Sequence, residues 1–178
     1  MIIAYEAVRV HAANEKWWRD LDTGQAIERN FGELVMLTIS ELAEALEGDR
    51  KNLMDDKLPH RPMIEVELAD TVIRMFDYIG AYNLRIENTD ESYPRLSTNT
   101  GENLLHITQR LCNAYQFFTA NCRNLAGEEL AGALSIIFEL AYAKNLDLLG
   151  AYEEKMAYNA VREDHKIEAR KLANGKKY

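Results

Sequence analysis

Apolar side chains recur at helical spacing along most of the chain. The pattern predicts helices over residues 4–20, 30–47, 62–83, 104–122, 127–145 and 147–173. Gly48 is expected to end the second of these helices, and Pro62 suits the first turn of the third. The polar stretch 85–103 predicts a long surface loop, and the final NGKKY is expected to fray. We therefore expect an all-α helical bundle.

The composition and net charge of the chain limit its fold class and its possible binding partners. The 178 residues include only three prolines and nine glycines, which favours helices, and they suffice for one domain over 1–178. The net charge of −8 argues against binding to a nucleic acid polymer or an anionic membrane, because both need an excess of Lys and Arg. No run of 18 apolar residues or basic secretory signal is present. We expect a cytoplasmic protein.

The helix at 30–47 carries an unusual set of carboxylates in ISELAEALEG. Glu41 and Glu44 lie three residues apart, where like charges repel along a helix face, and Glu47 follows. The helix is apolar almost all round, which is typical of a buried helix. At least one of these carboxylates should therefore be held away from water, and we expect a cation as its partner.

The helix at 62–83 supplies a second pair, Glu67 and Asp70, again three residues apart. Considered alone, its polar stripe, which also includes Arg74 and Asp77, is more simply interpreted as a solvated face. Two antiparallel helices would, however, bring the pair to the level of the acids at 41 and 44. The sequence then predicts four carboxylates at one site.

Such an oxygen-only site suits a hard cation. Mg²⁺ and Mn²⁺ prefer carboxylate oxygens, whereas a ferritin-like di-iron centre would use Glu-x-x-His. No Glu in the chain has a His three residues later, so iron or zinc is the weaker interpretation. The four histidines are interpreted as ordinary surface or core residues: His11, His60, His106 and His165.

These motifs resemble the MazG-like all-α nucleoside triphosphate pyrophosphohydrolases. That family has a helical E-x-x-E pair followed by a helical E-x-x-D pair, here ELAE at 41–44 and ELAD at 67–70. The segment EEKMAYNAVREDHK is similar to the family's closing helix, and NEKWWRD is similar to its first helix. The resemblance covers residues 10–84 and 146–166.

The resemblance implies Mg²⁺-dependent hydrolysis of a nucleoside triphosphate to a monophosphate and pyrophosphate, for nucleotide-pool control or house-cleaning. Mn²⁺ would be able to substitute, and a homodimer or higher homo-oligomer is implied. The metal-binding and catalytic residues would be Glu41, Glu44, Glu67 and Asp70.

The resemblance also assigns residues to the substrate. Lys155 and Arg162 would hold phosphates, and Asn159 would bind phosphate or sugar. Trp17 or Trp18 would stack on the nucleobase, although a core tryptophan is an equally good interpretation.

One departure from the family concerns the general base. Many members carry a doubled acid, E-E-x-x-E, and Ser40 stands where the first Glu would be. Either Glu44 or Glu47 assists the attacking water, or no separate base is needed. The nucleobase and the sugar are also left open.

A second departure is the extra helical hairpin at about 85–146. Shifted by 62 residues, ELADTVIRMFDYIGAYNL aligns with ELAGALSIIFELAYAKNL, and shifted by 69, TISELAEA aligns with ITQRLCNA. The hairpin is therefore either a degenerate duplicate of the acidic hairpin, in which Arg110 and Gly132 stand where Glu41 and Asp70 do, or an unrelated insertion.

Two other functions remain open. One is a non-catalytic helical interaction protein, in which the carboxylates are only surface charge. The other is a nucleotide phosphohydrolase that releases inorganic phosphate, which analysis of the products would distinguish.

Overall fold

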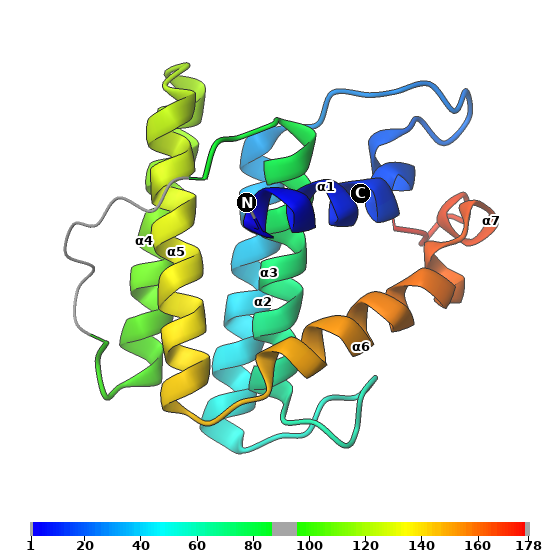
Figure 1. The fold of residues 1–178 in the computed structure, drawn as a ribbon. Coiled ribbons are helices and arrows are strands. Elements are labelled where there is room, and N and C mark those ends of the chain that lie inside the picture. Colours follow the sequence, from blue (N-terminus) through cyan, green and yellow to red (C-terminus); the bar gives the residue numbers. More distant parts are fainter. Residues whose placement is uncertain (1, 87–95, 177–178) are drawn as a thin grey trace.

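The computed structural model describes residues 2–86 and 96–176, in which every regular element is a helix and no β-strand is present. This confirms the predicted all-α fold. The helices, shown in Figure 1, are α1 (Ile2–Asn14), η1 (Glu15–Trp18), α2 (Phe31–Lys51), α3 (Met63–Ala81), α4 (Thr100–Thr119), α5 (Arg123–Ala143), α6 (Leu148–Val161), η2 (Glu163–His165) and α7 (Ile167–Arg170).

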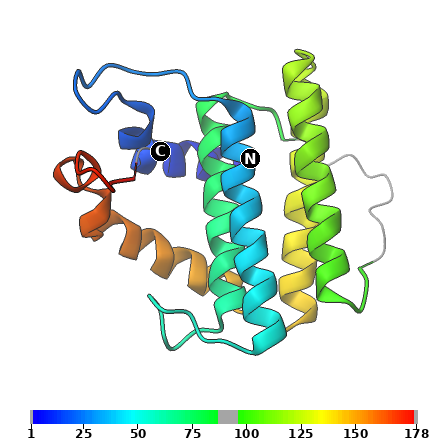
Figure 2. The same cartoon turned by 180° about the vertical axis from the view of Figure 1, so that it is seen from behind.

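Helix α3 lies at the centre of the molecule. It packs against α2, α1, α6 and α5, while α4 pairs with α5 and also contacts α2. The two views in Figures 1 and 2 show α4 and α5 on one side of the α2–α3 pair, and α6 crossing it obliquely on the other. Most of α3 is buried as a result, including polar residues of its stripe such as Glu67 and Asp77. The solvated-face interpretation of this helix is therefore wrong.

Side-chain caps fix the start of three of these helices. The Asn30 side chain accepts the Glu33 amide at α2, Asn99 accepts the Glu102 amide at α4, and Asp147 accepts the Gly150 amide at α6. Each cap satisfies an amide that the first helical turn leaves without an intrahelical partner.

Helices α2 to α5 share one way of ending. Each is followed by an asparagine with positive φ, namely Asn52, Asn83, Asn121 and Asn145. After each of these, the next amide bonds to a carbonyl five residues earlier, as from Leu53 to Gly48 at 3.0 Å. This is the Schellman arrangement, which glycine favours and asparagine tolerates.

The predicted stop at Gly48 is wrong. Helix α2 continues to Lys51, and Gly48 is buried within it. A Cβ at this position would lie 2.8 Å from the Cβ of Met63, the first residue of α3. The glycine is therefore explained by the close approach of the next helix and not by a helix end.

Three other predicted boundaries need correction. The first α-helix ends at Asn14, and residues 15–18 form a 3-10 turn. The last helix does not run to 173, because α6 ends at Val161 before two short helices. Helix α4 begins at Thr100, inside the predicted loop 85–103, while residues 87–95 of that loop lie outside the described residues.

The hairpin of α4 and α5 brings the aligned positions together. Arg110 Nη1 lies 3.1 Å from Glu129 Oε2, and a Cβ on Gly132 would lie 2.8 Å from Arg110 Cδ. The residues aligned with Glu41, Glu67 and Asp70 thus form one local group, with a guanidinium group inside it. Duplication as the origin of the hairpin stays a prediction.

Candidate functional site: an acidic cluster beside a cavity

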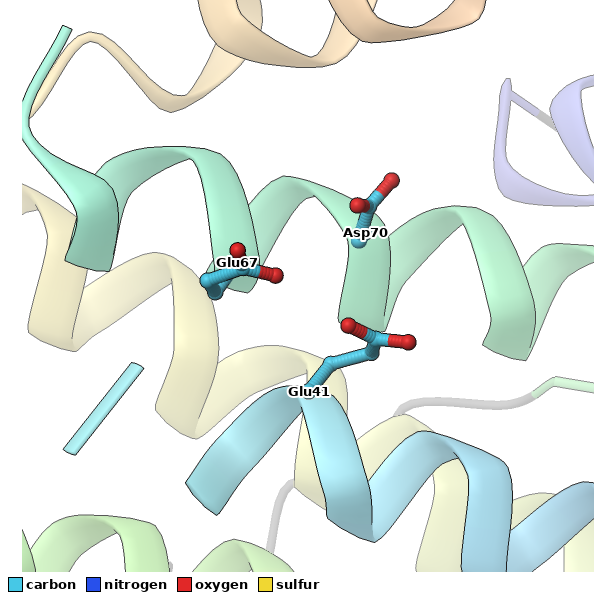
Figure 3. A group of neighbouring side chains, drawn as sticks. All are labelled: Glu41, Glu67 and Asp70. Atoms are coloured by element: carbon cyan, nitrogen blue, oxygen red, sulfur yellow. The ribbon is translucent and has the colours of Figure 1, made fainter. Parts of the chain in front are cut away.

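Three carboxylates from neighbouring helices converge at the middle of the molecule. Glu41 reaches across from α2 towards Glu67 and Asp70 on α3, as Figure 3 shows. Each offers an oxygen, and these three oxygens all lie within 4.8 Å of one another. Glu41 and Glu67 are buried, with 7% and 5% of their surface exposed. This is the only such group among the residues that the structure describes.

The protein itself supplies two cations to this group. Arg74, one turn after Asp70, donates from Nε to Glu41 Oε1 at 2.6 Å. Lys155 of α6 places Nζ 2.8 Å from Asp70 Oδ2 and is itself buried. The expectation that a cation accompanies the acids is therefore met in part by side chains, and a metal ion is not needed to explain how these acids are tolerated.

Burial and mutual repulsion perturb the titration of the cluster. Burial, followed by the charges of Asp70 and Glu41, raises the pKa of Glu67 to about 9. Burial also raises the pKa of Asp70, although Lys155 opposes the shift. At neutral pH the Glu67 carboxyl group is thus protonated and hydrogen-bonded to Glu41. The three acids are balanced by Arg74, Lys155 and one proton.

The remaining predicted acids lie outside this group. Glu44 is exposed, although partial burial, with Glu41 and Asp70 nearby, raises its pKa. Glu47 pairs with Arg50 and Lys51 on its own helix, and these hydrogen bonds lower its pKa. The structure therefore brings together three of the four predicted metal ligands.

A cavity of about 300 Å³ opens beside the cluster. Asp70 and Arg74 line one part of it, and the rest is lined by residues of α1, η1, the loop before α2, α2, α3, α6, η2 and the C-terminal segment. These are Asn14, Trp17, Arg29, Leu34, Leu37, Ile73, Asp77, Tyr78, Asn159, Arg162, His165 and Lys176. Four of the lining residues are Lys or Arg and two are Asp. Each of the four cations also pairs with an acid: Arg29 with Glu33, Arg74 with Glu41, and both Arg162 and Lys176 with Asp164.

The two adjacent tryptophans lie in different environments. Trp17 lines the cavity, and the Arg170 guanidinium lies 3.9 Å from the centre of its ring. Trp18 is buried, and its indole N–H donates to Asp77 Oδ1 at 3.0 Å. His11 Nδ1 lies 3.0 Å from the same oxygen. Of the two, Trp17 is in a position to meet a ligand and Trp18 is a core residue.

The predicted phosphate-binding face of α6 is divided. Lys155 is paired with Asp70, whereas Asn159, one turn later, and Arg162, which follows the end of α6 with extended backbone, line the cavity. The Asn159 Oδ1 atom is buried without a hydrogen-bond partner in the described structure. A buried acceptor of this kind is costly unless a ligand or water satisfies it.

Several cavity residues escaped the sequence analysis as binding candidates. Arg74 follows Asp70 at i+4 on the polar stripe, so its helical position was a usable signal. His165 was interpreted as an ordinary histidine, but it lines the cavity, and burial together with Lys176 and Arg162 lowers its pKa to about 4. Arg29 and Lys176 lie outside the long helices, where no periodicity pointed to them.

The donor set of the cluster fits a hard dication. Three carboxylate oxygens within 4.8 Å are the ligands that Mg²⁺ and Mn²⁺ prefer, and no Cys or His belongs to the group. Glu41, Glu67 and Asp70 would hold such an ion, at the cost of the Glu67 proton.

Comparisons with known proteins do not assign the chain to a family. No protein-family model matches the sequence, and no curated protein or solved structure matches it significantly. None of the described helices is long and apolar enough to cross a membrane.

Proposed function

We propose that the protein is a Mg²⁺-dependent nucleoside triphosphate pyrophosphohydrolase, a hydrolase acting on an acid anhydride. One observation carries the proposal: three carboxylates, two of them buried and one half-buried, converge within 4.8 Å beside a cavity lined by four Lys or Arg residues. A dication and a polyanion are complementary to these two surfaces. The E-x-x-E and E-x-x-D motifs support the same chemistry through the MazG-like resemblance.

Glu41, Glu67 and Asp70 would bind the metal, and Mn²⁺ would substitute for Mg²⁺. The bound ion would neutralise phosphate charge and acidify a water molecule. Glu44 would then accept the proton of the attacking water, because a general base works best with a pKa close to the working pH and the pKa of Glu44 is raised. Glu47 is the poorer base, since Arg50 and Lys51 lower its pKa.

The cavity would receive the rest of the nucleotide. Arg162 would bind phosphate oxygens, and Trp17, which lines the cavity, would contact the nucleobase. The buried acceptor of Asn159 would take a hydrogen bond from the sugar or the base. Lys155 would act at a distance from the substrate, holding Asp70 in place. The products would be a nucleoside monophosphate and pyrophosphate.

The proposal is tested by incubating the purified protein with a panel of canonical and modified triphosphates and Mg²⁺ or Mn²⁺. We expect pyrophosphate and monophosphate in equal amounts, and no turnover in excess EDTA. Release of inorganic phosphate alone would support a phosphohydrolase instead. Activity in EDTA would contradict the metal requirement.

Two amide substitutions provide a matched comparison. Glu41→Gln removes a charge from the cluster and should lower kcat/KM by at least about 100-fold, by analogy with other electrostatic contributions to catalysis. Glu139→Gln makes the same change at an exposed position on α5 and should leave kcat/KM unchanged. Equal activity of the two variants would refute the assignment of Glu41.

A non-catalytic interaction protein is the second candidate. The observation that favours it is the self-compensation of the cluster by Arg74 and Lys155, which makes the fold tolerable without metal. Binding of Mn²⁺, measured by calorimetry, distinguishes the two candidate functions, because a non-catalytic interaction protein should not bind the ion. Cytoplasmic location and assembly into homodimers or larger oligomers belong to the enzyme proposal and are tested by fractionation and light scattering.

A further inference from the structure

Arg74 is shared between the acidic cluster and the cavity. Its Nε and Nη2 atoms lie 2.6 and 2.5 Å from one oxygen of Glu41, and the same side chain lines the cavity wall. The side chain is 37% exposed, whereas that of Lys155, the other cation of the cluster, is 5% exposed. Of the two internal cations, only Arg74 has open space next to it.

A divalent ion and Arg74 would compete for Glu41. Glu41 also takes part in the hydrogen bond with Glu67, so both the guanidinium and the neighbouring acid occupy it when no metal is bound. A dication placed among these oxygens would repel the two cations already present. Lys155 cannot leave without separating a buried ion pair, which is strongly unfavourable. Arg74 is therefore the cation that can move.

We propose that Arg74 serves as an exchangeable counter-ion: it neutralises Glu41 in the metal-free protein, leaves when a divalent cation binds, and then binds the phosphate groups of the substrate. This inference rests on the proposed function. Arginine suits the second task, because its planar fork matches phosphate oxygens as well as carboxylates. Metal binding would thereby prepare the cavity for the polyanion, and the two ligands would bind cooperatively.

The test measures two affinities for one variant. For Arg74→Ala we expect Mn²⁺ to bind about fivefold or more tightly in calorimetry, because a repelling charge is gone. The KM for the triphosphate, and the Kd for pyrophosphate in the presence of Mn²⁺, should rise by about 10- to 100-fold, the value of a charged hydrogen bond. Arg74→Lys should restore part of the phosphate affinity, because it keeps the charge without the fork.

Two control variants identify the cause. Arg162 lines the same cavity but does not contact the acidic cluster. Arg162→Ala should therefore weaken pyrophosphate binding and leave the Mn²⁺ affinity unchanged. Arg110→Ala removes an arginine paired with a glutamate on the other hairpin and should change neither affinity.

Two results would overturn the inference while leaving the proposed function intact. Weaker Mn²⁺ binding by Arg74→Ala would mean that Arg74 stays on Glu41 and orients it as a ligand. An unchanged pyrophosphate Kd would mean that Arg74 does not reach the phosphates. Failure of the unaltered protein to bind Mn²⁺ or to release pyrophosphate would instead refute the proposed function itself.

Discussion

Glu67→Gln should make the metal-free protein more stable, by an amount that grows with pH. The pKa of Glu67 rises from 4.5 to about 9 on folding, so between these values the folded state holds a proton that the unfolded state has lost. The wild-type free energy of unfolding therefore falls by about 1.4 kcal/mol per pH unit through this group. Glutamine mimics the protonated acid and carries no such penalty. At pH 7 the variant should be more stable by about 3 kcal/mol, or about 6–12 °C in Tm.

Urea unfolding of both proteins in EDTA, at several pH values between about 5 and about 8, measures the difference in their free energies of unfolding. Because the other titrating groups are common to both proteins, this difference reports on Glu67. Glu139→Gln, an exposed acid on α5, serves as the control and should show no trend. Mn²⁺ at about 1,000 times its Kd should reverse the order of stability at pH 7, because it adds about 4.1 kcal/mol to the wild type, which is more than the variant's lead of about 3 kcal/mol. A difference between Glu67→Gln and the wild type that stays constant with pH would refute the raised pKa of Glu67.

Asp70→Ala should abolish turnover and, by leaving buried Lys155 unpaired, cost about 3 kcal/mol of stability, while Asp70→Ala combined with Lys155→Met should regain stability but not activity. Urea unfolding and pyrophosphate release measure the two effects, and equal stability of both variants would contradict the buried ion pair. The pair Arg110→Glu and Gly132→Asp should create a second Mn²⁺ site, seen as a doubled stoichiometry in calorimetry, if the hairpin of α4 and α5 descends from the acidic one. Trp18→Ala should lower the free energy of unfolding by about 3–5 kcal/mol, because it empties a core position, and a loss near zero would place that ring outside the core.

The helices and the acidic hairpin could be predicted from sequence because their signals are local. Periodicity located α2 and α3, and the paired spacing of Glu41 with the acids of α3 brought the three ligand candidates to one site. Gly48 was misassigned because a glycine that permits close helix packing has the same sequence signal as one that ends a helix. Only the position of α3 relative to α2 distinguishes the two.

The electrostatic state of the site could not be predicted in the same way. The MazG-like resemblance assigned Lys155 to phosphate, but a motif along one helix does not show which acid on another helix its lysine meets. The separation of Trp17 from Trp18 likewise depends on tertiary packing around Asp77.

The asparagines that end four successive helices offer a route to a more heat-resistant protein. Asn52, Asn83, Asn121 and Asn145 all hold a left-handed backbone that glycine adopts without steric cost. None of them belongs to the acidic cluster or the cavity wall. Glycine at these helix ends should therefore raise the thermal stability of the protein without altering the acidic cluster or the cavity.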